Sequence, residues 1–375
     1  MYVLIAPNAF KNSLAAGEAA AAIRDGLSRS RLNAITECFP VGDGGDGTGG
    51  LLIQRLNGRM VSTEASDPLG RKIEVKFGMV GSSNAIIEMA AASGLHLLKQ
   101  TELDPLRATS AGTGDLIRAA LDLRAQRIVI GMGGSATIDG GTGILQTLGA
   151  RFLNSNGQVL ENLPAQLPDL DSIDLSGLYP GLASTQMIVL CDVMNPLTGP
   201  FGAASVFGPQ KGAKPRDLQQ LESGLARLAQ VIARQTGKNI ADLPRAGTAG
   251  GAAAGLYGLL NAELVSGIEY FLQITDFDET LCRSDLVITG EGSIDEQTLQ
   301  GKAPFGVATH AKAHGIRVIA LTGSLPDDPV PLHPWFNEII PINPDSLPLA
   351  EALANAAANL AAAARDLGNR LAATR

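Results

Sequence analysis

The chain has 375 residues with a formal net charge of −8, and 44 of its residues are glycine. A hydrophobic content of 45% excludes a disordered chain, and the glycines follow no collagen repeat. No block of Lys and Arg provides the positive field that nucleic acid or an anionic membrane surface requires, and no apolar run is long enough to span a bilayer. The short apolar run at the N-terminus has no basic segment before it, and the three cysteines are widely spaced. We therefore expect a globular protein in a reduced, cytoplasmic compartment, with no signal peptide.

The first part of the chain alternates between strand and helix patterns. Residues 2–6 form an apolar run typical of a strand, and the alanine-rich stretch 15–28 has helical periodicity. A second strand is predicted over 35–41, and a helix begins near Leu51 after the glycine-rich sequence GDGGDGTGG. From residue 59 to 89 the pattern changes to the alternation typical of antiparallel strands.

The middle and the end of the chain contain further strand and helix patterns. The middle region predicts a helix over 110–123, buried strands at RIVI and QMIVL, and a hairpin around 150–160. Near the C-terminus, strands at DLVIT, RVIAL and EIIP alternate with a helix over 304–314 and a long helix over 349–371. Such alternation favours a parallel sheet, and we expect these late strands to complete the sheet that the first two begin.

The length of the chain predicts two domains of moderate size. We predict an α/β fold in which a discontinuous Rossmann-like domain, residues 1–60 plus 280–375, is interrupted by a mixed α/β domain, residues 61–279. The active site is expected in the cleft between these two domains.

Polar residues follow the apolar runs at five places, and in open α/β folds ligands bind outside the carboxyl ends of the strands. The same residue types recur at these places: glycine, lysine, and residues with a hydroxyl or a carboxylate group. Phosphoryl transfer uses these groups, since amides and lysines surround phosphate oxygens and carboxylates hold magnesium. The five places are Lys11; Asp43 and Asp46; Gly131–Asp139; Asp192–Gly199 with Gly208–Gly212; and Gly290–Lys302.

Each of these loops has a structural reading as well. A strand followed by a glycine-rich turn and a helix occurs in any doubly wound fold, and an Asp can simply cap a helix. The chain contains neither a P-loop sequence nor the protein-kinase motifs. Residues 131–136 match a dinucleotide fingerprint, but no acidic residue follows at the distance that would bind a ribose. His310 and His314 are four residues apart on a predicted helix, and without a third ligand nearby an exposed helix face is the simpler reading.

Eight segments together resemble the bacterial glycerate kinases that phosphorylate the 2-hydroxyl of D-glycerate. They lie in the order and with the spacing of that family, from the first strand to beyond residue 300. The segments are IAPNAFKNSL, PVGDGGDGT, SDPLGR, ATSAGTGDLI, GMGGSATIDGGTGILQTLG, CDVMNPLTGPFGAASVFGPQKGA, GTAGGAAAGL and DLVITGEGSIDEQTLQGKAPFGVA. The resemblance implies a two-domain α/β kinase that uses ATP and magnesium to make 2-phosphoglycerate.

The motifs supply the set of site residues, and we infer their division of roles from the chemistry. Asp192 and Asp295 compete for the role of base, and Lys11 is the third catalytic candidate. The nucleotide is expected at Gly133, Gly134, Ser135, Thr137, Lys211 and Lys302. The acid substrate is expected at Lys11, Arg71, Asn195, Gln297 and Thr298, and magnesium at Asp43, Asp46 and Glu291.

The chain departs from the family pattern at a few positions. The family usually has Asp-Ser where this chain has Asn8 and Ala9, Glu where it has Asp46, and often Arg where it has Ser293. A kinase of a related small hydroxy acid, or a non-catalytic nucleotide or sugar-acid sensor with the same fold, is therefore an alternative. The expected partners are small molecules only, and a homodimer is one option for the assembly. More than half of the glycines lie in the motif segments, which predicts that they serve the approach of backbone to phosphate.

Overall fold

The computed structural model describes residues 1–296, 298–326, 328–344 and 347–374, and it divides the chain into two compact units. Unit 1 consists of Met1–Asp43 and Ile268–Arg375, and unit 2 of Gly44–Gly267. Both breaks fall earlier in the chain than the predicted bounds near residues 60 and 280. The first lies earlier because helix α2 (Thr48–Arg55) packs on strands of unit 2. The second lies earlier because Ile268 of α9 (Gly267–Ile274) packs on Gly306 in unit 1.

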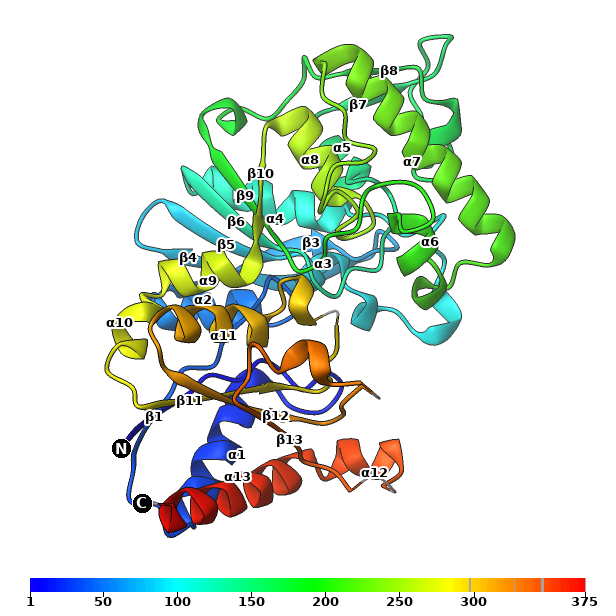
Figure 1. Cartoon of the computed structure of the whole chain (residues 1–375). Helices are drawn as coiled ribbons and strands as arrows, with labels where there is room; N and C mark the ends of the chain where they lie inside the picture. Colours follow the sequence, from blue (N-terminus) through cyan, green and yellow to red (C-terminus); the bar gives the residue numbers. More distant parts are fainter. Residues whose placement is uncertain (297, 327, 345–346, 375) are drawn as a thin grey trace. The chain divides into compact units, whose positions relative to one another are not determined.

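Unit 1 is a five-stranded parallel sheet with helices on both faces (Figure 1). The strand order is β13-β12-β11-β1-β2, and every neighbouring pair is parallel. The late strands therefore do complete the sheet that the first two begin. Counted along unit 1, the order is 2-1-3-4-5, one of the two common doubly wound arrangements. The strands are β1 (Tyr2–Ile5), β2 (Ile35–Cys38), β11 (Leu286–Glu291), β12 (Arg317–Thr322) and β13 (Glu338–Pro341).

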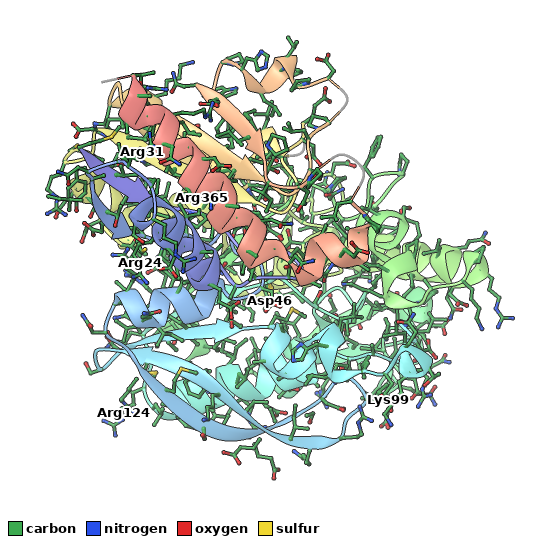
Figure 2. All side chains as sticks on the ribbon, turned by 90° about the horizontal axis from the view of Figure 1, so that it is seen from below. Arg24, Arg31, Asp46, Lys99, Arg124 and Arg365 are labelled. Atoms are coloured by element: carbon green, nitrogen blue, oxygen red, sulfur yellow. The ribbon has the colours of Figure 1, made fainter. Side chains whose placement is uncertain are left out.

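Helices α1 and α13 lie side by side over one face of this sheet (Figure 1). Their small and aliphatic side chains, such as Ile23 and Leu360, form one core with Val3 and Ile5 of β1. The arginines of the pair, such as Arg24 and Arg365, are exposed (Figure 2). The helices of unit 1 are α1 (Ala16–Ser28), α9, α10 (Phe277–Leu281), α11 (Ala303–Ala313), α12 (Leu349–Ala354) and α13 (Ala356–Ala373), with short 3-10 turns at Thr298–Gln300 and Val330–Leu332.

The long helix predicted over 349–371 is two helices, so that prediction was wrong in one respect. α12 ends and α13 begins at Asn355. The side-chain amide of Asn355 donates to the carbonyl oxygen of Glu351 at 3.0 Å, as does its backbone amide. A side chain that competes for backbone partners in this way favours a break in a helix.

Unit 2 contains a six-stranded mixed sheet in the order β10-β9-β6-β5-β4-β3. β3, β4 and β5 are antiparallel, as the alternation over 59–89 predicts, whereas β5, β6, β9 and β10 are parallel. Helices α4 and α8 pack with one face of the sheet, and α2 packs on β4, β5 and β6. The strands are β3 (Arg59–Ser66), β4 (Lys72–Val80), β5 (Asn84–Glu88), β6 (Arg127–Gly131), β9 (Gln186–Cys191) and β10 (Glu263–Ser266).

The longest helix of unit 2 is α7, which has 22 residues and packs beside a small two-stranded sheet (Figure 1). That small sheet pairs β7 (Arg151–Leu153) with β8 (Ser172–Asp174). The hairpin predicted around 150–160 is reduced to a single bridge from Leu153 to Val159, because β7 takes β8 as its ladder partner. The helices of unit 2 are α2, α3 (Ala90–Ser93), α4 (Ala111–Asp122), α5 (Thr142–Thr147), α6 (Ala203–Phe207), α7 (Pro215–Thr236) and α8 (Ala252–Leu260), with 3-10 turns at Leu95–Leu97, Gln100–Glu102, Leu167–Asp169, Leu182–Ser184 and Pro209–Lys211.

Candidate functional site

In unit 1 the strand order reverses at β1 and β11. From β1 the chain continues to β2 on one side, whereas β11, β12 and β13 lie on the other. The backbone amide of Asn8, just beyond β1, donates to the carbonyl oxygen of Gly290 near the end of β11 at 2.8 Å. At such a switch point the connections diverge and leave a crevice, which is where doubly wound sheets bind ligands. Asn8 and Glu291 flank this point.

Asp43 lies beside Asn8 and is 8% exposed. Its Oδ2 accepts a hydrogen bond from Asn8 Nδ2 at 3.0 Å and a longer one from the amide of Ala303, at the start of α11, at 3.4 Å. A carboxylate at a helix N-terminus is stabilised by the helix dipole. The structure thus brings Asp43, from the second predicted loop, to the switch point.

Glu291 ends β11 and is 7% exposed. Burial raises its pKa to about 7, and the nearby carboxylates of Asp43 and Asp295 add to the increase, whereas Lys302 and a hydrogen bond from Thr298 oppose it. Thr298 Oγ1 donates to Glu291 Oε1 at 2.8 Å. Glu291 is therefore divided between its protonated and ionised forms at neutral pH.

The other predicted residues of unit 1 differ in how exposed they are. Thr298 is fully buried and its amide donates to Asp295 Oδ1 at 3.2 Å, so its visible role is to hold Asp295 and Glu291. Lys302 precedes α11 and is partly buried, whereas Lys11 is exposed. Gln297 lies outside the described residues.

In unit 2 the parallel strands β5, β6 and β9 end at one edge of the sheet. The turn that follows β6 is held by the loop 44–47, since the amides of Met132 and Gly133 both donate to the carbonyl oxygen of Gly44 at 3.1 Å. A Cβ on Gly133 would lie 2.3 Å from the backbone nitrogen of Asp46, which only glycine avoids. Asp46 itself is exposed and lies just before α2 (Figure 2).

Lys211 braces the predicted phosphate turn from inside unit 2. Its Nζ donates to Ser135 Oγ at 2.9 Å and to the carbonyl oxygen of Thr137 at 2.8 Å, and the residue is 4% exposed. Burial lowers its pKa to about 7, while Asp139 and Asp192 oppose the decrease. Lys211 thus holds Ser135 and Thr137 in place and carries only part of a positive charge at neutral pH.

Three of the turn's amides are already used within the protein. Besides Met132 and Gly133, Ala136 donates its amide to the carbonyl oxygen of Ser93 at 2.9 Å. Asp139, at the end of the turn, accepts hydrogen bonds from the amides of Ser110, Gly141 and Gly143 at 2.9 to 3.2 Å. The buried carboxylate of Asp139 therefore has a structural role, since it accepts hydrogen bonds from amides at the N-termini of α4 and α5.

Arg71 and Asn195, predicted to bind the acid substrate, are both engaged in unit 2. Arg71 pairs with Asp67 through its Nε and with Glu102 through its Nη1 at 2.8 Å. Asn195 Nδ2 donates to the carbonyl oxygen of Phe201 at 2.8 Å. Asp192, one of the two predicted bases, is partly buried after β9. The other predicted base, Asp295, belongs to unit 1.

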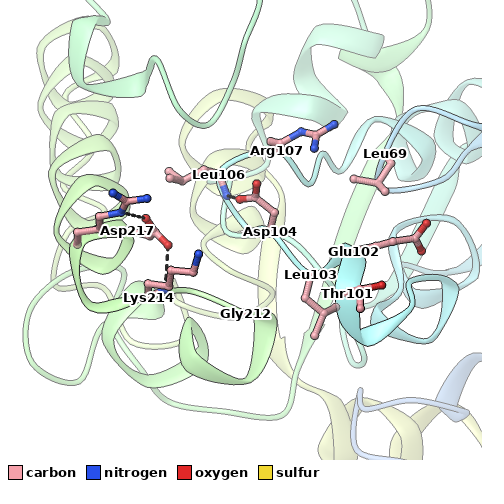
Figure 3. Close-up of a pocket in the computed structure, with 11 residues that line it drawn as sticks. Leu69, Thr101, Glu102, Leu103, Asp104, Leu106, Arg107, Gly212, Lys214 and Asp217 are labelled. Carbon is pink, nitrogen blue, oxygen red and sulfur yellow. Dashed lines mark hydrogen bonds and ion pairs between the residues drawn. The ribbon is translucent and has the colours of Figure 1, made fainter.

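A pocket of about 510 Å³ lies in unit 2, where the loop that follows Gln100–Glu102 faces the start of α7 (Figure 3). Three leucines supply apolar surface, and the charged part of the lining has three basic and three acidic side chains. Figure 3 shows Asp217 bonded to the backbone of Lys214. The pocket is lined by Leu69, Thr101, Glu102, Leu103, Asp104, Leu106, Arg107, Gly212, Lys214, Arg216 and Asp217.

The predicted magnesium ligands divide between the two units, with Asp43 and Glu291 in unit 1 and Asp46 in unit 2. Within the described ranges, no group of three or more His, Cys, Asp or Glu side chains is arranged to hold a metal ion. Magnesium is usually held by one or two carboxylates together with waters and substrate phosphates. Asp43 and Glu291 fit that pattern, because their carboxylates lie within electrostatic range of one another.

Glu88 was not predicted as a site residue. It is the last residue of β5 and is in register with Gly131 of the neighbouring parallel strand β6. Its place at the end of an apolar run is the signal in the sequence that marks it. The alternation over 59–89 indicates antiparallel strands, whereas β5 is antiparallel to β4 and parallel to β6.

Comparison with known proteins shows which family the chain belongs to. A model of the glycerate kinase family matches residues 3–372. The chain belongs to the glycerate kinase family. It is 43% identical over 369 residues to a glycerate kinase of Bacillus subtilis, covering 98% of this chain and 97% of the relative. It is 41% identical over 374 residues to a glycerate 2-kinase of Escherichia coli, covering 99% and 98%.

A solved member of the glycerate kinase family has the same fold. The crystal structure of a candidate glycerate kinase 2 from Salmonella typhimurium LT2 matches with a TM-score of 0.83 and 41% identity, covering 100% of this chain and 99% of that one. The family assignment thus rests on both sequence and fold. In the described part of this chain, no helix is long and apolar enough to cross a membrane.

Proposed function

We propose that this chain transfers the γ-phosphoryl group of ATP to the 2-hydroxyl of D-glycerate, giving 2-phosphoglycerate and ADP. The bond between the γ-phosphorus and the bridging oxygen of ATP breaks, a bond to the glycerate oxygen forms, and the hydroxyl proton passes to a carboxylate. The observation that carries the proposal is the convergence of Asn8, Asp43 and Glu291 at the switch point of unit 1. The relative from Escherichia coli, named a glycerate 2-kinase, supports the choice of hydroxyl.

Unit 1 supplies the groups that phosphoryl transfer requires. Asp43 and Glu291 are the proposed magnesium ligands of this unit, and Lys302 lies close enough to Glu291 to lower its pKa. Magnesium, when bound, neutralises the charge that spreads over the phosphoryl oxygens. Lys11 is exposed just beyond β1 and is proposed to bind the carboxylate of glycerate.

Unit 2 is proposed to hold the nucleotide. Lys211 holds Ser135 and Thr137 in a fixed turn at the carboxyl edge of its sheet. The pocket of about 510 Å³ lies in the size range of small-molecule sites, and its leucines suit a base. Its three basic side chains, which are matched in number by three acidic ones, are the candidates for contacts with phosphate. Replacing Lys214 and Arg216 by alanine should raise KM for ATP and leave KM for glycerate unchanged.

The decisive test incubates the pure protein with ATP, magnesium and D-glycerate and follows ADP release, with the position of the phosphate read by ³¹P NMR. Formation of 2-phosphoglycerate supports the proposal. A different preferred acceptor in a panel of small hydroxy acids would identify a kinase of a related acid. ATP binding without ADP release would favour the non-catalytic sensor.

The base is tested by two matched variants, Asp192→Asn and Asp295→Asn. The variant that removes the proton acceptor should lose kcat by about 100-fold or more, because general base catalysis contributes about 10²–10⁴-fold, while its affinity for ATP remains. Near-normal turnover in both variants would show that neither residue is the base.

A further inference from the structure

Glu88 places a carboxylate at the N-terminus of α2. The amide of Gly49 donates to its Oε1 at 2.9 Å, and the amides of Gly47 and Gly50 also hydrogen-bond to this carboxylate. A Cβ on Gly49 would lie 2.5 Å from Glu88 Cγ, so glycine is required for the contact. These amides belong to the first turn of a helix, which has no intrahelical partners for them. A side chain from the end of β5 therefore occupies the anion site that the loop and helix create.

The same loop carries Asp46, and it is held from two sides. On one side the amides of Met132 and Gly133 donate to the carbonyl oxygen of Gly44. On the other side the carboxylate of Glu88 binds the amide of Gly47, the residue directly after Asp46, and the amide of Gly49. Asp46 is exposed, and its charge acts on Glu88. The only described carboxylate that the loop presents to solvent thus sits beside an internal carboxylate that anchors the loop.

We infer that Glu88 is a positioning residue that orients Asp46 for the nucleotide and its magnesium. Glu88 acts through the amides of Gly47, Gly49 and Gly50 and does not need to touch either substrate. This inference rests on the proposed function and on the prediction from the sequence that Asp46 is a magnesium ligand.

The kinetic test is a double-mutant cycle with Glu88→Ala and Asp46→Asn. Glu88→Ala should lower kcat/KM for magnesium-ATP by about 100-fold, as a displacement of about 1 Å in a positioned group does. Glu88→Gln, which keeps an acceptor oxygen, should recover part of the loss. Because Glu88 acts through Asp46, the double variant should be no worse than Asp46→Asn alone. Losses that multiply in the double variant, or a Glu88→Ala enzyme with normal kinetics, would overturn the inference.

A matched control is Asp115→Asn. Asp115 also binds a backbone amide through its carboxylate, since Oδ2 accepts from Ser66 at 2.9 Å. This variant keeps an acceptor oxygen, as Glu88→Gln does, but removes the negative charge from a bond of the same kind elsewhere in unit 2, and its kcat/KM should remain normal. An equal loss in Asp115→Asn would show that any carboxylate-to-amide bond of this unit matters equally, which contradicts a specific role for Glu88.

Amide hydrogen exchange supplies a readout that does not depend on activity. In Glu88→Ala the amides of Gly47, Gly49 and Gly50 should exchange at least about tenfold faster, the change expected when a bond worth about 1.4 kcal/mol is lost. Exchange confined to peptides covering 44–52 supports the inference, and unchanged exchange overturns it. If the wild-type protein failed to phosphorylate glycerate, the proposed function would fall while this exchange experiment still tested the anchoring role of Glu88.

Discussion

The side-chain amide of Asn8 donates to Asp43, with 3.0 Å from Nδ2 to Oδ2. The oxygen of the same Asn8 side chain accepts from the amide of Ala9 at 2.8 Å, so both ends of the amide group are used. The sequence comparison with the family pattern led us to expect Asp at this position. The neutral amide therefore removes one negative charge from the switch point and gives Asp43 a hydrogen-bond donor instead.

Asn8→Asp should make the stability of the protein depend on magnesium. A carboxylate at this position would lie beside Asp43, and the loss of the hydrogen bond with the added repulsion should lower the free energy of unfolding by about 1–3 kcal/mol without metal. Magnesium should raise Tm more in this variant than in the wild type, because a cation relieves the repulsion and binds only the folded state. Thermal unfolding with and without magnesium measures the difference. Asn8→Ala is the control, since it loses the donor without adding a charge and should gain nothing extra from magnesium.

Activity should rise with pH around neutrality. Burial raises the pKa of Glu291 to about 7, so this carboxyl loses its proton as the pH passes through that value. If its ionised form holds magnesium, kcat/KM should increase between about pH 6 and 8, and the inflection should move to lower pH as magnesium is added, because the cation favours the charged form. The pH profile of Glu291→Gln should lack this inflection. An unchanged inflection in that variant would assign the titration to another group.

His310 should stabilise unit 1 in a pH-dependent manner. Its ring nitrogens donate to Glu269 at 3.1 Å and to Asp278 at 2.7 Å. These bonds, chiefly the one to Glu269, raise the pKa of His310 to about 9, although burial opposes the increase. Because the folded pKa exceeds the unfolded value of about 6.5, the stabilisation is complete below that value and is lost as the pH rises through 9. His310→Ala should lower the free energy of unfolding by about 1 kcal/mol at pH 6, since water screens the half-exposed carboxylates.

The effect of His310→Ala should disappear near pH 10, and urea unfolding at the two pH values measures it. The exposed His333 provides a control, because His333→Ala should change stability little at either pH. A deficit in His310→Ala that persisted at pH 10 would show that His310 contributes through packing and not through charge.

Replacing two helical glycines by alanine should change the free energy of unfolding in opposite directions. Gly17 of α1 has open space around its Cβ position, so Gly17→Ala should raise the free energy of unfolding by about 0.5–1 kcal/mol. A Cβ on Gly255 of α8 would lie 2.1 Å from the carbonyl oxygen of Gly140, so Gly255→Ala should lower it by about 3 kcal/mol. Denaturant unfolding of both variants checks the signs. A neutral Gly255→Ala would mean that α8 moves away from the turn at little cost.

Only the tertiary structure shows what the glycines of the motif segments lie against. The abundance of glycine in the motifs predicted an approach of backbone to phosphate. In unit 2 a large part of that glycine instead allows protein loops to approach one another. Gly255 meets Gly140, and Gly133 meets the loop before Asp46. A sequence marks where a Cβ is absent, but it does not identify the atoms that occupy the space.

The elements of the sheets were accessible from the sequence because apolar runs and their periods are local properties. That locality explains why β1, β11 and β12 lie where the patterns placed them, and why Asp43 and Glu291 were found directly after strands. α7 was not predicted, although its buried leucines follow a helical period.

By itself, the sequence determined the family, the strands of the parallel sheet and the residue types available for phosphoryl transfer, since these depend on local pattern and on motif order. Only the tertiary structure decided what surrounds each side chain. It buried Lys211 against Ser135, engaged Arg71 with Asp67 and Glu102, and turned Glu88 into the partner of the α2 N-terminus. The physical reason is that burial and hydrogen-bond partners come from residues far apart in the chain, which are brought together only by the pairing of strands and the packing of helices.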